Sequence, residues 1–270
     1  MANDVIISLV GLFATIIGAG SYFYKVKKHR TPDKPIFFVI MLIVGFISSV
    51  SSLTLTLQSF RFFSIMVILF ATIPILMSIV FTVTFRGSKA PVGRLQVATG
   101  DTLLPFSAIK ADGTYFSTSE LKGLRVLLKF YRGSWCPYCS TELEMFDEMK
   151  PVFDDYNVKV IAISGDTPEA TRAHQKRDNL SHLLLSDPEL NIIKQYGVEH
   201  HKAFGGDATP AKKVLGLPFP TKMKYRSMAI PTSILVDEHG TIIWIDQSED
   251  VRMRANEKLI NRVLLSAFGH

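Results

Sequence analysis

Cys136 and Cys139 are the only cysteines in the 270 residues, and their Cys-x-x-Cys spacing is typical of a redox-active dithiol. They follow an apolar run, 126–131, that predicts a strand, and they precede residues 141–150, which predict a helix. A helix N-terminus carries partial positive charge and unpaired backbone N–H groups, which stabilise a thiolate and lower its pKa. Pro137 suits the first turn, where no N–H is missed. Both sulfurs then face one side of that turn, so one can attack a substrate and the other can close a disulfide.

Two other roles for the cysteine pair have less support. Zinc takes four protein ligands, or three and a water, and the sequence has no second Cys-x-x-Cys pair. His200 and His201 are adjacent histidines in a polar stretch, where solvated side chains are the usual case. A purely structural disulfide would close a very small loop and add little stability. We therefore expect a redox dithiol, with no metal and no other cofactor.

Hydropathy divides the chain into two parts. Hydrophobic residues make up 47% of the sequence and are concentrated in residues 1–86. The stretches 5–24, 36–57 and 62–85 contain no charged residue and no histidine, and about 20 apolar residues span a bilayer core. We predict a membrane domain with three transmembrane helices at these positions. The first stretch could instead be a signal peptide, but no Lys or Arg precedes its apolar run.

Charge in the connecting segments predicts the orientation of the spans. Basic residues gather between the first two spans and after the third: Lys25, Lys27, Lys28, Arg30, Lys34, Arg86, Lys89 and Arg94. The second connection has only Arg61. Cytoplasmic segments carry an excess of Lys and Arg, so we predict a multi-pass protein with its N-terminus outside and its redox domain cytoplasmic. Residues 1–86 hold +5 of the net charge of +6, so the basic character gives little support for a nucleic-acid partner.

A linker over 87–100 leads to a predicted redox domain over 101–270, where strands alternate with helices. Strands are expected at 125–131, 158–164, 182–185, 233–236 and 241–245, after a hairpin turn at 111–113. Helices are expected after the dithiol, after Asp166-Thr167-Pro168, after Asp187-Pro188 and over 255–267. This order predicts an α/β domain with a mixed central sheet flanked by helices.

Residues 198–226 are predicted to be a long polar insertion that is solvated. The insertion precedes Pro231 and can border the site, and its basic residues are compatible with anionic lipid or an acidic substrate. Glu142, Glu144 and Asp237 are interpreted as solvated or capping residues.

The segment 130–139, Phe-Tyr-Arg-Gly-Ser-Trp-Cys-Pro-Tyr-Cys, resembles the active site of the peroxiredoxin-like branch of the alkyl hydroperoxide reductase/thiol-specific antioxidant (redoxin) family. The resemblance covers about residues 98–267, including 160–164 and 230–237, and leaves the membrane region outside. It implies a thioredoxin-like fold, with Cys136 as the attacking cysteine and Cys139 as the resolving cysteine. A peroxide substrate and an external thiol reductant, a thioredoxin-like protein or glutathione, are the implied partners.

Two positions depart from the family pattern. The family places Thr or Ser three residues before the attacking cysteine, where this chain has Gly133, and it places an Arg where this chain has Pro231. Ile230-Pro231-Thr232 instead resembles the cis-proline loop of thioredoxins, and Pro137-Tyr138 resembles the glutaredoxin site. We therefore predict a cis bond at Ile230–Pro231, with a backbone edge that binds a peptide or glutathione. A trans proline at a strand start is the alternative.

Two further side chains beside the dithiol each have two interpretations. Arg132 either supplies the cation that the family's arginine would provide or pairs with an acid at the strand end. Trp135 either shields the dithiol or simply packs. The first functional hypothesis is a membrane-anchored, thiol-dependent peroxidase in contact with the lipid bilayer. The alternative is a thioredoxin- or glutaredoxin-like thiol–disulfide oxidoreductase acting on protein or glutathione disulfides, and a redox-sensing membrane protein is the third hypothesis.

Overall fold

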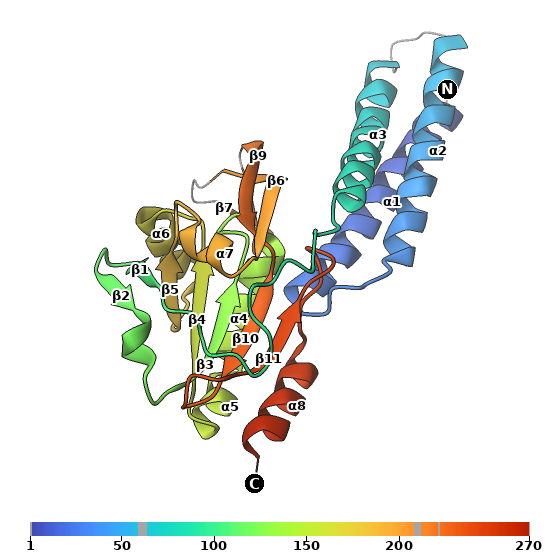
Figure 1. Ribbon diagram of the computed structural model, residues 1–270. Helices are drawn as coiled ribbons and strands as arrows, with labels where there is room; N and C mark the ends of the chain where they lie inside the picture. Colours follow the sequence, from blue (N-terminus) through green and yellow to red (C-terminus); the bar gives the residue numbers. More distant parts are fainter. Residues whose placement is uncertain (1, 59–63, 208–211, 221, 270) are drawn as a thin grey trace. The chain divides into compact units, whose positions relative to one another are not determined.

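The computed structural model describes residues 2–58, 64–207, 212–220 and 222–269. The chain forms two compact units, which divide between Ser88 and Lys89 (Figure 1). Residues 89–100, predicted as a linker, belong to the second unit, because their backbone pairs with it. The Ala90 N–H donates to the Glu249 carbonyl at 2.8 Å, and the Gly100 N–H donates to the Ile242 carbonyl at 2.8 Å.

The first unit contains three helices: α1 (Ala2–Lys27), α2 (Ile36–Gln58) and α3 (Ser64–Arg86). Each is long and apolar enough to cross a membrane. The helices predicted over 5–24 and 36–57 are therefore confirmed. The third was predicted to begin at residue 62, and residues 62 and 63 lie outside the described part of the chain.

Small residues let α1 and α2 approach closely. A Cβ atom added at Gly11 would lie 3.0 Å from the Gly45 carbonyl oxygen, and one added at Gly45 would clash with Thr15. Ser49 and Ser52 of α2 are also buried, as expected for polar residues of apolar helices that pack together. The outward faces of all three helices expose large apolar side chains.

In the second unit, seven of the described strands form one sheet in the order β11-β10-β3-β4-β5-β1-β2 (Figure 1). The strands are β1 (Ser107–Lys110), β2 (Tyr115–Ser117), β3 (Arg125–Phe130), β4 (Val158–Ser164), β5 (Leu183–Ser186), β10 (Thr232–Val236) and β11 (Ile242–Gln247). The central strands β3, β4 and β5 are parallel, and the outer pairings are antiparallel. The predicted mixed sheet is confirmed.

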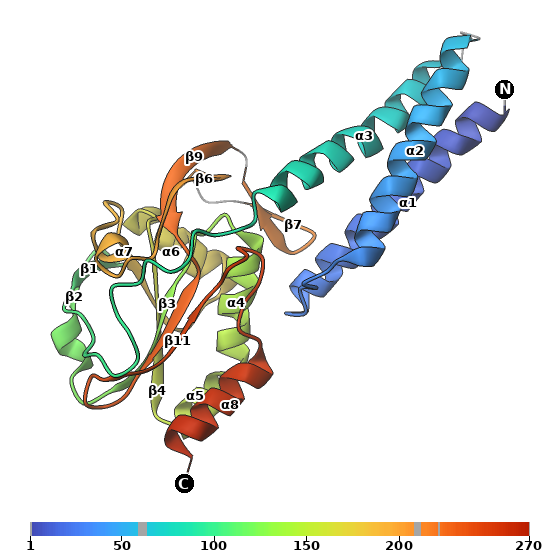
Figure 2. The same ribbon diagram turned by 45° about the vertical axis from the view of Figure 1, so that its right-hand side comes forward.

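Helices lie against both faces of this sheet (Figure 2). They are the 3-10 helix η1 (Thr118–Leu121) and the α-helices α4 (Pro137–Glu148), α5 (Lys150–Asp155), α6 (Pro168–Asp178), α7 (Asn191–Gln195) and α8 (Glu257–Phe268). The expected helix start after Asp166 is confirmed, because the Thr167 hydroxyl caps α6 by accepting from the Ala170 N–H.

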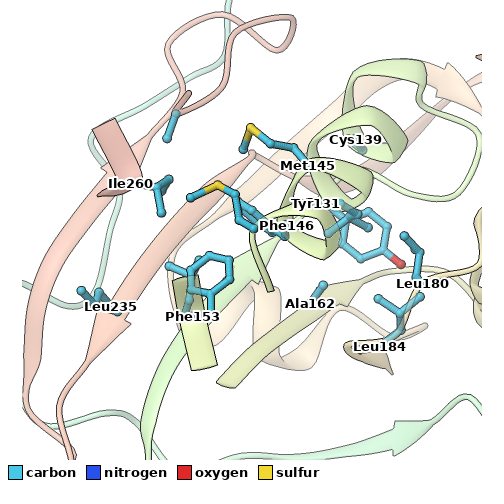
Figure 3. Packing of buried hydrophobic residues seen from close by; sticks show 14 of the residues in the cluster. Tyr131, Cys139, Met145, Phe146, Phe153, Ala162, Leu180, Leu184, Leu235 and Ile260 are labelled. Carbon is cyan, nitrogen blue, oxygen red and sulfur yellow. The ribbon is translucent and has the colours of Figure 1, made fainter. Parts of the chain in front are cut away.

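Alternation along β3 divides the hydrophobic residues into two cores. Leu127 points to the core that includes residues of α4 and α8, and Leu128 points to the core that includes Tyr196, beyond α7. Cys139 belongs to the first core, with Phe146 (Figure 3). The dithiol helix is therefore held in the interior by its apolar face.

The prediction of a solvated loop over 198–226 is wrong. The described part of this segment contains β6 (Glu199–Gly206), β7 (Lys212–Val214), β8 (Leu217–Phe219) and the start of β9 (Met223–Ala229). Strand β6 pairs with β9, and β7 pairs with β8, both antiparallel. Buried apolar side chains, Leu217 and Met228 among them, fix these hairpins to the domain. Residues 208–211 and 221 lie outside the described part of the chain.

Candidate active site

The dithiol lies at the start of α4. This helix begins at Pro137, four residues before the start at residue 141 that the sequence predicted. Cys136 is the N-cap residue, with extended backbone, and Pro137 occupies the first helical turn. The N–H groups of Cys139 and Ser140 donate to the Cys136 carbonyl, at 3.2 and 3.1 Å. The two cysteines are unbonded thiols, and both are buried, with 1% and 0% of their surface exposed.

Two charged side chains fix the loop that precedes the dithiol. Asp166 accepts a hydrogen bond from the Ser134 N–H at 2.6 Å. The Arg177 guanidinium donates to the Ser134 carbonyl and to the Ser140 hydroxyl, both at 2.8 Å. The loop and the first turn of α4 are thus held to α6 and to the loop after β4. Sequence reasoning assigned neither residue to the site.

Gly133 is required by this loop. Its φ of +144° is in the region that favours glycine, and a Cβ atom there would lie 2.7 Å from the Trp135 indole nitrogen and 2.8 Å from an Asp166 carboxylate oxygen. The threonine that the family places here does not fit this backbone. Any peroxide bound at this dithiol must be held by other groups.

Gly133→Ala is expected to lower the free energy of unfolding more than Gly113→Ala. Gly113 has a φ of +90° and nothing within 4 Å of an added Cβ atom, so its substitution costs only backbone strain, about 1–2 kcal/mol. At Gly133 the clash adds about 1–3 kcal/mol of overpacking. Urea unfolding of the full chain, followed by tryptophan fluorescence, measures the difference. Equal losses would show that the loop has room for a side chain.

A buried charge cluster includes one of the two thiols and consists of Lys129, Glu142, Arg254 and Cys139. The Arg254 Nη2 atom donates to the Cys139 sulfur at 3.1 Å, and its Nε atom lies 2.8 Å from Glu142. The Lys129 ammonium lies 2.6 Å from the other Glu142 oxygen and donates to the Ser233 hydroxyl at 3.0 Å. The side chains of Lys129 and Glu142 are 0% and 1% exposed, so the interpretation of Glu142 as a solvated or capping residue is wrong.

The cluster sets the charge state of the two thiols. Burial would raise the pKa of Cys139, but the hydrogen bond from the Cys136 thiol, the Arg254 guanidinium and the Arg132 backbone N–H outweigh it and hold this pKa well below its usual value. Burial and the adjacent Cys139 raise the pKa of Cys136. Burial also raises the pKa of Glu142, against the opposing effects of Lys129 and Arg254. The pair thus loses its first proton early, and the charge rests on Cys139.

Arg132 and Trp135 pack against each other beside the dithiol. The Arg132 guanidinium lies 5.0 Å from the Trp135 ring centroid and donates to the Phe204 carbonyl at 2.9 Å. Strand β6 also packs against the indole, because a Cβ atom added at Gly205 or Gly206 would lie 2.6 Å from it. The insertion therefore borders the site, and direct contact with a thiol comes from Arg254.

The predicted cis bond at Ile230–Pro231 is wrong, because the described residues contain no cis peptide bond. The backbone edge that was predicted to bind a peptide or glutathione also has partners within the protein. The Ile230 N–H donates to the Val198 carbonyl at 2.7 Å, and the Pro231 carbonyl accepts from the Ser248 N–H at 2.9 Å. Pro231 is thus the alternative that the sequence allowed, a trans proline directly before β10.

The buried charge cluster gave only weak signals in the sequence. Lys129 is the one charged residue in the apolar run 126–131, and a lysine in a central strand needs a buried partner. Glu142 follows Cys139 by three residues, on the same face of the helix. Arg254 lies 115 residues after Cys139, and no sequence spacing points to it.

A central sheet with a buried Cys-x-x-Cys pair at the first turn of a covering helix defines a dithiol oxidoreductase. The model of the AhpC/TSA family matches residues 99–245 of the sequence. This match spans more than half of the chain, which therefore belongs to the AhpC/TSA family, the redoxin family that its active-site segment resembles.

Individual relatives agree with this assignment. Peroxiredoxin Bcp of Escherichia coli is 32% identical over 111 residues, which cover 40% of this chain and 69% of the relative. The chloroplastic peroxiredoxin Q of Sedum lineare is 30% identical over 119 residues, which cover 43% of this chain and 64% of the relative. The thiol–disulfide oxidoreductase ResA of Halalkalibacterium halodurans is 26% identical over 145 residues, which cover 53% of this chain and 65% of the relative.

A solved structure shows the same fold. It is a cysteine-to-serine mutant of PrxQ from Xylella fastidiosa, with a TM-score of 0.50 and 17% sequence identity over 65% of this chain and 99% of that chain. The thioredoxin-like peroxiredoxin fold is thereby confirmed for the second unit.

Proposed function

We propose that this protein is a membrane-anchored thiol peroxidase in which Cys136 attacks the peroxide and Cys139 resolves the product. The observation that carries the proposal is the contact of Arg254 with Cys139, which provides the buried dithiol with a stabilised thiolate. Membership of the AhpC/TSA family supports peroxide as the oxidant.

The reaction uses the two thiols in sequence. A Cys136 thiolate attacks one peroxide oxygen, the O–O bond breaks, and the leaving alkoxide takes a proton to become an alcohol, or water when the substrate is hydrogen peroxide. Cys136 is then a sulfenic acid. The Cys139 sulfur attacks it, a disulfide forms, and hydroxide leaves and is protonated to water. Two thiols of an external reductant, a thioredoxin-like protein or glutathione, restore the dithiol by exchange.

The charge that rests on Cys139 has to reach Cys136 before the attack. The two sulfurs share a hydrogen bond, so transfer of one proton from Cys136 to Cys139 moves the charge. After the attack the role of Cys139 is reversed, because Arg254 again stabilises it as the thiolate that closes the disulfide. Arg254 therefore serves the resolving step directly.

Single-cysteine variants test which sulfur attacks. Cys139→Ser should still form a sulfenic acid when hydrogen peroxide is added to the reduced full chain, and Cys136→Ser should form at least about tenfold less in the same time. Mass spectrometry after trapping with dimedone measures both. If Cys136→Ser forms the sulfenic acid and Cys139→Ser does not, the roles are exchanged. If neither variant reacts faster than a free thiol at the same pH, the peroxidase proposal is wrong.

The alternative, exchange with protein or glutathione disulfides, is supported by Gly133, which provides no hydroxyl for a peroxide, and by the similarity to ResA. This alternative also rested on a cis-proline edge, and the described residues contain no cis peptide bond. Oxidised glutathione, tested beside peroxide on the same reduced chain, separates the two activities. Faster oxidation by glutathione would favour the alternative.

The membrane anchor is the second half of the proposal. Three helices that expose apolar side chains around the bundle, and that contain no charged residue over 5–24 or 36–57, support insertion in a bilayer. The basic residues of the first connection favour a cytoplasmic redox domain. Lipid hydroperoxides would then be formed close to the enzyme. Protease protection of sealed vesicles, with cleavage of the second unit from the cytoplasmic side only, tests this orientation.

A further inference from the structure

We propose that the insertion hairpins of the second unit dock on the surface of a bilayer that contains anionic lipid. The docking surface consists of exposed apolar residues at the hairpins, Val214, Leu215, Phe219 and Tyr225, together with Lys212, Lys222 and Lys224. This inference rests on the proposed membrane anchor and is independent of the chemistry of the dithiol.

The turn between β7 and β8 is the first observation. Leu215 and Gly216 form it, with φ values of +53° and +82°, and Val214 pairs with Leu217 on either side. Two-residue turns of this kind favour Asn or Asp followed by Gly, because a residue with a large side chain adopts positive φ with difficulty. Leu215 is nevertheless at the first position, and it is 87% exposed. In water, leucine at this position costs free energy twice, through the positive φ of its backbone and through the exposure of its apolar side chain. An apolar phase would bury that side chain.

The hairpin is fixed to the domain at its base, so its tip cannot simply fold inward. Leu217 is 2% exposed in the core, and the Lys213 ammonium lies 2.7 Å from Glu144 and 3.0 Å from Asp178. Glu144, interpreted as solvated or capping, is thus an anchor of this hairpin. Val214 and Leu215 are presented outward by a rigid support.

Charge identifies the occupant of this surface. Residues 198–226 contain six basic residues, and only Glu199 and Asp207 are acidic. Lys213 and Arg226 face acids of the domain, but Lys212, Lys222 and Lys224 are exposed. Lysines around exposed apolar side chains match the interfacial region of an anionic bilayer, where the ammonium groups meet phosphates and the apolar groups enter the acyl boundary.

The neighbouring hairpin contributes aromatic side chains. Phe204 of β6 and Tyr225 of β9 lie directly opposite each other, with ring centroids 5.2 Å apart, and they are 42% and 74% exposed. Tyrosine is typical of the headgroup level of membranes, where its ring is in the apolar phase and its hydroxyl is in water. Because the adjacent Gly205 and Gly206 lie against Trp135, docking would place lipid close to this residue, which directly precedes Cys136 in the sequence.

Spin labelling of the full chain in lipid nanodiscs tests the inference. The chain has only two cysteines, so Cys136→Ser with Cys139→Ser leaves a background in which Leu215→Cys carries a single label. In discs of phosphatidylcholine mixed with phosphatidylglycerol, this label should become accessible to oxygen and shielded from a water-soluble nickel complex. In pure phosphatidylcholine it should stay in water. Adding Lys222→Glu or Lys224→Glu should lower the docked-to-free ratio about fivefold or more for each lysine removed.

Two matched labels separate docking from insertion. Tyr115→Cys on β2, at a side chain that is 82% exposed, should stay in water in both discs. Ile47→Cys on α2, at a side chain that is 58% exposed, should be in lipid in both discs, which shows that the anchor is inserted. If the label at 215 is in water in both discs while the label at 47 is in lipid, the inference is overturned. Equal shielding in both discs would also overturn it, because anionic lipid would then have no part.

Amide hydrogen exchange of the unsubstituted chain in the same discs provides a second measurement that does not depend on the labelled variants. Residues 212–219 should exchange more slowly in the anionic discs than in the neutral discs. Identical exchange in both would contradict docking. Oxidation of the dithiol by hydrogen peroxide in detergent tests the peroxidase chemistry separately, so docking and this chemistry can fail independently.

Discussion

Replacing Arg254 with methionine is expected to slow the reaction of the reduced dithiol with iodoacetamide at pH 7 by about tenfold or more. Only the thiolate reacts, and Arg254 donates to the Cys139 sulfur at 3.1 Å from a side chain that is 9% exposed, where water screens the charge little. Without this cation, burial dominates and the pKa of Cys139 rises, so less thiolate is present at pH 7.

Arg252→Met is the matched control for Arg254→Met. Arg252 lies two residues away in the same segment and pairs with Asp250 at 2.6 Å. Its loss should leave the alkylation rate within about twofold of the unsubstituted chain, because most mutations away from the reacting atoms act weakly. Arg254→Lys should recover part of the rate. If Arg254→Met reacts as fast as Arg252→Met, another group holds the thiolate.

The same cation gives stability a defined pH dependence. The folded pair loses its first proton below the ordinary thiol pKa of about 8.5 and its second above it. Between the first folded pKa and about 8.5, the unfolded chain holds more protons, so stability rises with pH. Above about 8.5 the folded chain holds more, so stability falls. Urea unfolding across this range should show the rise, and Arg254→Met should flatten it.

Glu142→Gln is expected to lower the free energy of unfolding by about 3–5 kcal/mol, the usual cost of removing one partner from a buried ion pair. Lys129 is 0% exposed and lies 2.6 Å from Glu142, so the substitution leaves its ammonium buried without its counter-charge. Asp154→Asn, in the exposed pair of Lys150 and Asp154, should cost only about 0.3–0.5 kcal/mol. The fluorescence of Trp135 and Trp244, both in the second unit, reports urea unfolding of this unit alone.

The effect of Glu142→Gln on the dithiol has the opposite sign. Glu142 competes with the Cys139 thiolate for Arg254, so its neutral replacement should lower the pKa of Cys139 and speed alkylation. A variant that is less stable and yet more reactive would distinguish this charge competition from general loosening of the fold. Slower alkylation of the Glu142→Gln variant would show that the carboxylate acts on Cys139 by positioning Arg254 and not through its charge.

The elements that the sequence predicted well have local causes. Charge-free stretches of about 20 residues predict helices α1 and α2, because a helix that can span a bilayer excludes charged residues. Apolar runs predict β3 and β4, because both faces of a central strand are covered. The Cys-x-x-Cys spacing alone predicts the dithiol. Pro137 in the first turn of α4 agrees with the sequence prediction, whereas the regular helix that the pattern predicts from Thr141 begins four residues earlier, at Pro137.

The features that the sequence could not predict depend on pairing across long separations. Arg254 reaches Cys139 only after β10 and β11 return the chain to the sheet, and Glu142 is buried only because Lys129 faces it. Polar residues such as Glu199 and His200 favour a loop in the sequence, and yet both belong to β6 because they pair with Ala229 and Met228 of β9. The cis bond at Ile230–Pro231 was predicted by likeness to thioredoxins, and the described residues contain no cis bond.

The buried charge cluster also has a consequence for redox equilibrium. With a thiolate on Cys139, its two cations and two anions balance, whereas disulfide formation removes one anion and leaves a net positive charge in the interior. An uncompensated buried charge is costly, so the oxidised form is destabilised relative to the reduced form. A stabilised thiolate form makes a dithiol a strong oxidant, and we expect a reduction potential above the value of about −270 mV for thioredoxin. Because of this high potential, the disulfide of this protein should be short-lived wherever thiols are abundant. Equilibration with glutathione buffers measures the potential.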